Sequence, residues 1–441
     1  MKTFKKFLAL FLVLIFSLNA FSQDDSGISD DDRGLFSNDE STQEKEKDKK
    51  RVWDRWFEIG VMADVGISNN YFHISDLLKE EIIINMDEIN NGLEKNGLGI
   101  NNSLGTNAFI NLNTNIFKAS LSVGVEEKLN FTLGKGLFDF LANGNELDEA
   151  IVVSAGIGAS VFEENSFSLE IPVGKLKIKA TPSYFVPLLY VPYTPAEINA
   201  KIGSDGKVTA NGTATAIVYS PLPLNNFDEF SYDSIFNAFS HGGFDISLSG
   251  EYQLFESFSV GATLTHIPIV PSNLSCTNKY TASVNFEMDG LLDSLTQKAE
   301  TEEESELFKY DYSLSENEAA EQNPCKLVRP FKIGFNANWK VFNNNLLILS
   351  PMIQFKFADF TLENLLGFGF DYEITAKSYL GPLEPSFTTS CIDSVFSQQF
   401  NLALNLRLLE IDFLISTQSK NFLKSFAGSG LGVGVGFKVG F

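Results

Sequence analysis

The stretch Leu431-Gly-Val-Gly-Val-Gly-Phe-Lys-Val-Gly-Phe441 closes the sequence and decides the fold. Its apolar residues alternate with four glycines and one lysine. Because successive side chains of a strand point to opposite faces, one face of this strand is wholly apolar and the other is nearly bare. In water such a strand is an exposed aggregation site. In a closed transmembrane barrel the apolar face meets lipid and the glycines face the interior. The alternative is the last strand of a soluble β-sandwich.

The other end of the sequence indicates export. Three lysines among the first six residues precede the short apolar run 7–18, and the small residues Ala20 and Ser22 follow it. This pattern is typical of a cleavable secretory signal peptide and is too short for a membrane anchor. We therefore predict a signal peptide over residues 1–22, cleaved after Ser22. No later run approaches the ~18 apolar residues of a spanning helix.

Charge and composition narrow the class further. Residues 23–52 are acidic to mixed in charge and hold too few apolar side chains for a core, so we predict a disordered tail. The formal net charge of −23 excludes a nucleic-acid partner, since phosphate contacts need Lys and Arg. The 41 phenylalanines are spread by alternation, which suits lipid-facing strands and aromatic girdles as well as a soluble all-β core.

Alternating strands recur from Trp56 onward. The run 57–68 alternates over about twelve residues, close to the length that a tilted strand needs to cross a bilayer, and Trp53 and Trp56 precede it where an interfacial belt would lie. Thirteen to sixteen such strands can be counted. Since single-chain bacterial barrels have even strand numbers, residues 53–441 are predicted to form an all-β, antiparallel transmembrane β-barrel of about 14 strands, with 16 as the alternative. The last strand is expected to pair with 57–67 around a polar lumen.

Two insertions interrupt the strands. Residues 75–96 carry an apolar stripe at helical spacing and predict a helix that is either a plug in the lumen or a loop helix covering apolar wall. Residues 289–328 predict a large acidic loop. Its side of the membrane depends on whether 383–392 is a strand, because each strand reverses the chain. A few further short helices are expected in the loops.

The segment 176–193 is apolar, aromatic and broken by Pro182, Pro187 and Pro192. Proline cannot donate to a ladder, so this strand is expected to be kinked, edge-like or bulged. It is a candidate site for a lateral opening in the barrel wall, and a simple bend is the alternative.

Catalytic and metal motifs are missing from the sequence. The three histidines are scattered without metal spacing, and no nucleophile elbow, P-loop or dinucleotide fingerprint occurs, so we expect neither an enzyme nor a cofactor. Cys276 and Cys325 flank the acidic loop, and export permits a disulfide between them. Cys391 is left over.

The export signal, the alternating strands and the terminal aromatic residue together resemble a bacterial outer-membrane β-barrel, in which Phe437, Val439 and Phe441 would form the C-terminal insertion signal. Its partners would be the lipid bilayer and the barrel-assembly machinery. Size and strand number are similar to the FadL-type long-chain fatty-acid transporters, although the Asn-Pro-Ala plug motif of that family is absent.

The resemblance implies uptake of hydrophobic or amphipathic small molecules in the outer membrane. A general diffusion porin and a structural or adhesive surface protein are the alternatives.

Overall fold

The structure is a computed structural model of the chain. The predicted signal peptide, 1–22, and the predicted tail, 23–52, lie outside the residues that it describes. No helix in the described part is long and apolar enough to cross a bilayer, a finding with no bearing on crossing by strands. The structure describes residues 55–73, 85–93, 95–144, 149–204, 207–222, 237–274, 276–288, 308–317, 325–357 and 368–441.

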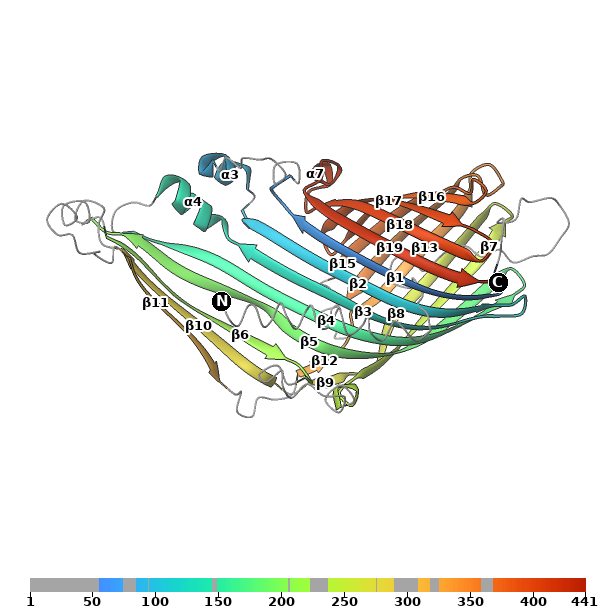
Figure 1. The fold of residues 1–441 in the computed structure, drawn as a ribbon, viewed down its shortest axis with the longest axis horizontal. Coiled ribbons are helices and arrows are strands. Elements are labelled where there is room, and N and C mark those ends of the chain that lie inside the picture. The colour runs from blue at the N-terminus through green and yellow to red at the C-terminus, as the bar shows by residue number, and fades with distance from the viewer. Residues whose placement is uncertain are drawn as a thin grey trace.

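Fourteen strands of the described chain form one closed antiparallel barrel (Figure 1). The last strand pairs with the first, from Gly440 opposite Glu58 to Gly430 opposite Ser68. The predicted class, strand number and closing pair are therefore confirmed. In order around the barrel the strands are β1 (Phe57–Asn69), β2 (Leu98–Asn113), β3 (Lys118–Leu133), β4 (Ala150–Val173), β5 (Leu176–Ile202), β7 (Gly243–Phe255), β8 (Phe258–Val270), β13 (Phe331–Lys340), β14 (Ile348–Phe357), β15 (Phe368–Lys377), β16 (Leu383–Ile392), β17 (Val395–Asn405), β18 (Leu409–Ser419) and β19 (Gly430–Gly440).

The two ends of the barrel differ. At the end where β1 starts and β19 finishes, here called the terminal end, the longest connection between strands runs only from Val341 to Leu347. At the opposite end, here called the loop end, most connections are longer, and the β16–β17 turn, Asp393 and Ser394, is the shortest. Residues 383–392 are a strand, β16, so counting back from the terminal end places the connection between β8 and β13 at the loop end. The predicted acidic loop 289–328 belongs to this connection. The prediction of a loop is wrong for Phe308–Asn317 and Cys325–Leu327, which are strands, and residues 289–307 and 318–324 lie outside the described part.

Side chains alternate between an apolar exterior and a sparse, polar interior. On β19 Val433 and Val435 are exposed on the outer face, as is Val65 of β1. The glycines of β19 face inward, where a Cβ at Gly436 would lie 3.1 Å from the Cβ of Asp412. Glycine is needed on this face because inward side chains of the neighbouring strands lie across β19.

A second sheet branches from β5 at the loop end. β4 and β5 have 24 and 27 residues, far more than the ~9–11 of one crossing, so both extend beyond the barrel. The outer half of β5 pairs with β6, β6 with β10, and β10 with β11, which form an arm beside the barrel (Figure 1). The remaining strands are β6 (Val208–Tyr219), β10 (Cys276–Met288) and β11 (Phe308–Asn317) of the arm, and β9 (Ser272–Leu274) and β12 (Cys325–Leu327), which pair with each other.

In the part of the chain that the structure describes, the helices with described bounds lie among the loops at the loop end: α3 (Met86–Gly92), α4 (Lys135–Asn143) and α7 (Phe422–Phe426). α3 is the described part of the helix predicted over 75–96. Its Ile89 packs with Phe138 of α4 and with Leu98 of β2. Leu98 lies on the same face of β2 as Ile110, which is opposite the outward-facing Ile59. α3 therefore covers the outer wall and not the lumen.

Candidate functional site

Three prolines interrupt the pairing of β5 with β4. Pro182 and Pro192 each fall in a gap between consecutive paired residues, and Pro187 lies beside a register shift that skips Leu188. The cause is chemical, since proline has no backbone N–H to donate to a ladder. Between the first and last of these prolines β5 is held to β4 by a broken ladder.

The opposite edge of β5 changes partner over the same residues. Leu176–Phe185 pairs with β7, whereas the pairing with β6 runs continuously only from Glu197 to Ile202. Over 186–196 the pairing of this edge with described residues is a single isolated pair, Tyr190 with Tyr219 of β6. Figure 1 shows β6 and β7 lying along different parts of β5. The barrel wall is thus divided beside 186–196. This feature is called the split, and the pair Phe185–Gly243 is its apex.

Among the described residues, apolar side chains of the β6–β7 connection cover the split from outside. Val186 is fully buried against Leu222 and Ala238, which belong to the β6–β7 connection. The hydroxyl of Tyr184 donates a hydrogen bond to the carbonyl oxygen of Phe239 in the same connection. The small β9–β12 sheet lies alongside, with β9 contacting both β5 and β7. The described part of the cover is therefore mainly apolar, and besides Tyr184 it is joined to β5 by the hydrogen bond that the Ser220 hydroxyl donates to the carbonyl oxygen of Leu188 at 2.7 Å.

A single guanidinium spans the apex on the luminal side. Arg329, just before β13, donates from Nε and Nη2 to the two carboxylate oxygens of Asp245 on β7, each at 2.8 Å. Its Nη1 donates to Glu164 of β4. The guanidinium also lies 5.0 Å from the centre of the Phe185 ring on β5. One side chain therefore joins β4 and β5 on one side of the apex to β7 on the other.

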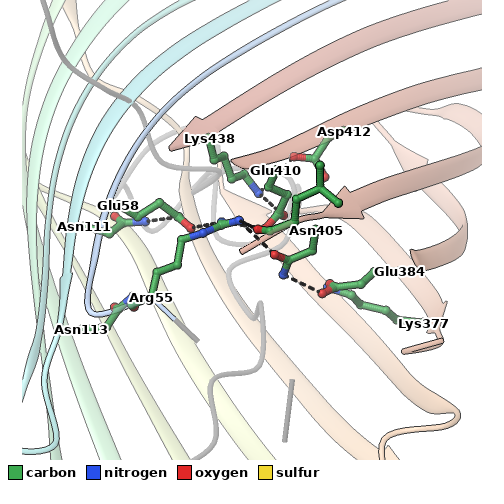
Figure 2. A network of polar contacts seen from close by, with 11 residues as sticks. Arg55, Glu58, Asn111, Asn113, Lys377, Glu384, Asn405, Glu410, Asp412 and Lys438 are labelled. Carbon is green, nitrogen blue, oxygen red and sulfur yellow. Dashed lines mark hydrogen bonds and ion pairs between the residues drawn. The ribbon is translucent and has the colours of Figure 1, made fainter. Parts of the chain in front are cut away.

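A second charged set lines the interior at the terminal end (Figure 2). Arg55, which precedes β1, lies 3.0 Å from Glu410 and 3.1 Å from Glu58, and it donates a 2.9 Å hydrogen bond to Asn405. Asn405 in turn donates to Glu384 of β16 at 3.0 Å. Glu410 and Glu384 are almost completely buried, and both have the partners that a buried carboxylate requires. Side chains as well as main chain thus hold the first strand to the last ones.

The short β16–β17 turn reaches across the lumen. Its Asp393 lies 3.4 Å from Nζ of Lys128 on β3, which is separated from β17 by β2, β1, β19 and β18 around the barrel. Asp393 also pairs with Lys356 of β14, and its backbone N–H donates to Asp371 at 3.1 Å. Burial raises the pKa of Asp393, but the charges of Lys128 and Lys356 outweigh burial and lower the pKa from 3.8 to about 2. The turn is therefore anchored by an ionised carboxylate.

The predicted C-terminal residues lie at the terminal end. Phe437 and Val439 are exposed on the outer face, and the Phe441 ring makes an edge contact with Trp56, with ring centres 5.1 Å apart. The main chain is joined here too, since the N–H of Trp56 donates to the carbonyl of Phe441 at 2.9 Å. The insertion role of these three residues stays a prediction.

Only one of the two cysteines of the predicted disulfide has a described side chain. Cys325 lies opposite Leu274 in the β9–β12 sheet. Leu274 precedes Cys276 by two residues in the sequence. Cys325 carries a free thiol, and the side chain of Cys276 lies outside the described part. The disulfide stays a prediction. In the described residues no three His, Cys, Asp or Glu side chains are grouped so that they could hold a metal.

Sequence reasoning missed the charged residues at the apex. Asp245, Glu164 and Arg329 are far apart in the chain: Asp245 and Glu164 lie within long strands, and Arg329 lies in the short segment before β13. The one available signal was Arg329 followed by Pro330 directly before an alternating run, and that signal is common.

These features define a class: a closed antiparallel barrel with a polar interior and a divided wall. No protein-family model matches the sequence, and no curated protein does. Solved structures are similar in fold. The toluene transporter TbuX of Ralstonia pickettii is 8% identical, with a TM-score of 0.43 over 88% of this chain and 90% of that one. The Pseudomonas putida toluene transporter TodX is 9% identical, with a TM-score of 0.43 over 87% and 89%. A TodX deltaS2S3 mutant, a monoaromatic hydrocarbon channel, is 10% identical, with a TM-score of 0.47 over 95% and 96%.

Proposed function

We propose that this chain is an outer-membrane barrel for the uptake of hydrophobic or amphipathic small molecules, with the split as a side passage between lumen and bilayer. The observation that carries the proposal is the exchange of strand partners along 186–196 of β5. Within the apolar belt a barrel keeps its ladder continuous, because unpaired backbone groups are costly in lipid, and the split begins where that belt ends. Here the ladder between β5 and β7 ends at Phe185, and apolar side chains of the β6–β7 connection cover the edge beyond it.

The position of the split supports this route. The ladder between β5 and β7 runs from Leu176 to Phe185, ten residues, which is about one bilayer crossing. The split therefore starts near the loop-end boundary of the apolar belt. Side chains in contact there include Val186, Leu222 and Ala238, which suit an apolar ligand more than a hydrated ion.

The location follows from the same features. Short turns at the terminal end and long connections at the loop end match the periplasmic and external sides of bacterial barrels. We infer that Phe437, Val439 and Phe441 are read by the barrel-assembly machinery and that the exposed apolar face contacts lipid. The acidic loop 289–328 would then be external. Cleavage of the export signal 1–22 is part of the same proposal.

A reversible lock on the cover tests the route. In a chain with its three cysteines changed to serine, Val186→Cys and Ala238→Cys are introduced together, because both side chains belong to one buried apolar cluster that joins β5 to the cover. Oxidation should abolish uptake of labelled toluene and of a long-chain fatty acid into proteoliposomes, and reduction should restore it. The control pair, Val65→Cys with Val433→Cys, lies directly opposite across the closing seam and should leave uptake unchanged after oxidation.

Other results would point elsewhere. Uptake that persists in the oxidised lock would exclude the split as the route. Large ion-conducting steps in bilayer recordings, without uptake of either probe, would instead favour the general diffusion porin. A closed lumen, with ligand binding that depends on the acidic loop, would favour the adhesive surface protein.

A further inference from the structure

The apex of the split is the end of a hydrogen-bonded ladder. Below it β5 and β7 are joined by a regular ladder, and above it they are not. A ladder that ends without support opens from its last pair, as the ends of other hydrogen-bonded elements fray. The last pairs here are Phe185–Gly243, Tyr184–Phe244 and Ser183–Asp245. A further contact is therefore needed to limit how far β5 and β7 separate.

Arg329 has the position and the chemistry for that task. Asp245 lies two pairs below the apex on β7, and Glu164 lies opposite Phe185 on β4. The side chain of Arg329 is 8% exposed and that of Asp245 2%, so water does little to weaken the contact between them. A planar guanidinium can hold one carboxylate with two parallel hydrogen bonds and still reach a second one, which a lysine cannot do.

We propose that Arg329 is the clasp of the split: it positions β4 and β5 against β7 and so sets how far the wall opens. This inference rests on the proposed function for its effect on uptake, but the clasp itself is a property of the folded barrel. Arg329 follows the acidic insertion directly, so the clasp also fixes the end of that insertion to the wall.

Hydrogen exchange measured by mass spectrometry tests the clasp without transport. In Arg329→Met, exchange in the peptide covering 243–248 should accelerate by about tenfold or more, the change expected from losing one hydrogen bond to a charged group. Exchange in the closing seam, 430–440, should not change. Glu164→Gln releases only the β4 side and should give a smaller acceleration. Arg329→Lys keeps the charge without the two-pronged geometry and should fall between wild type and Arg329→Met.

Uptake is the second measurement that tests the clasp. Arg329→Met and Glu164→Gln should each speed uptake of a bulky hydrophobic probe relative to toluene, because the opening extends further down the wall. Should Arg329→Met fail to fold, Glu164→Gln carries the test, since Glu164 is 29% exposed and its loss leaves the Asp245 contact in place.

Three outcomes separate the claims. Faster exchange in the seam as well as at the apex would mean that Arg329 only supports the whole barrel, and it would overturn the clasp. Unchanged exchange at 243–248 in a folded Arg329→Met barrel would also overturn it. Failure of the oxidised cysteine lock to block uptake would count against the proposed function alone, because the exchange measurement does not depend on transport.

Discussion

Arg55 shows what one buried charge contributes to closing the barrel. Its side chain is 3% exposed and lies between Glu58 and Glu410, and Glu410 is equally buried. Replacing Arg55 by methionine leaves the buried Glu410 with Lys438, 3.2 Å away, as its remaining cation, so the cost should stay below the about 3–5 kcal/mol of a buried charge left wholly unpaired. We expect the folded, heat-modifiable band of Arg55→Met to unfold at a clearly lower temperature on gels. The matched control is Lys118→Met, whose 4.0 Å contact with Glu170 is partly exposed and contributes about 0–1 kcal/mol. Equal shifts for both variants would contradict this account.

Asp393 gives the loop end a dependence on pH. Its pKa is lowered from 3.8 to about 2 in the folded protein, so the turn binds fewer protons folded than unfolded near pH 3. A depressed pKa contributes stability above pH ~4, and this contribution is lost as pH falls from about 4 to about 2. Asp393→Asn should therefore lower the unfolding temperature at pH 7, and the difference from wild type should vanish near pH 2. A difference that is the same at both pH values would show that the carboxylate charge is not what anchors the turn.

Single residues also show where prediction from sequence stops. The alternating side chains of β1 and β19 are a local, period-two signal, and the sequence predicts their closing pair from it. Arg329 carries no such signal, because its role depends on Asp245 and Glu164, which are brought to it by two different strands, β7 and β4. A contact among residues so far apart follows from the register of the whole wall.

At the scale of elements, β5 is the informative case. Its prolines predict a strand with a damaged ladder, and the breaks at Pro182, Pro187 and Pro192 confirm that expectation. The exchange of β7 for β6 could not be predicted, because a strand keeps the same alternation whichever neighbour it has. The helix expected over 75–96 shows the same limit: its stripe predicts a buried face for Ile89, but not whether lumen or outer wall buries it.

At the scale of the whole molecule, the order of strands settles an ambiguity that the sequence leaves open. Because β16 is a strand, the acidic loop lies at the loop end, which we place outside the cell. In the cysteine-free chain, Glu302→Cys should react with a membrane-impermeant maleimide on intact cells. Lys175→Cys, in the β4–β5 turn at the terminal end, should react only after the outer membrane is opened. The reverse labelling pattern would show that the barrel has the opposite orientation in the membrane.

The sharing of β5 between two neighbours has a consequence for assembly and for evolution. β6 follows β5 directly in the chain, so their hairpin is the more local contact and is expected to form before β7 arrives. β6 and β7 then compete for one edge of β5, and the position at which the pairing changes from β7 to β6 is a branch point. Because the hydrogen-bonded residue pairs of an antiparallel ladder occur at every second position, that branch point moves along β5 two residues at a time. The aperture between lumen and membrane therefore comes in discrete sizes, and insertions or deletions in β6 would select among them.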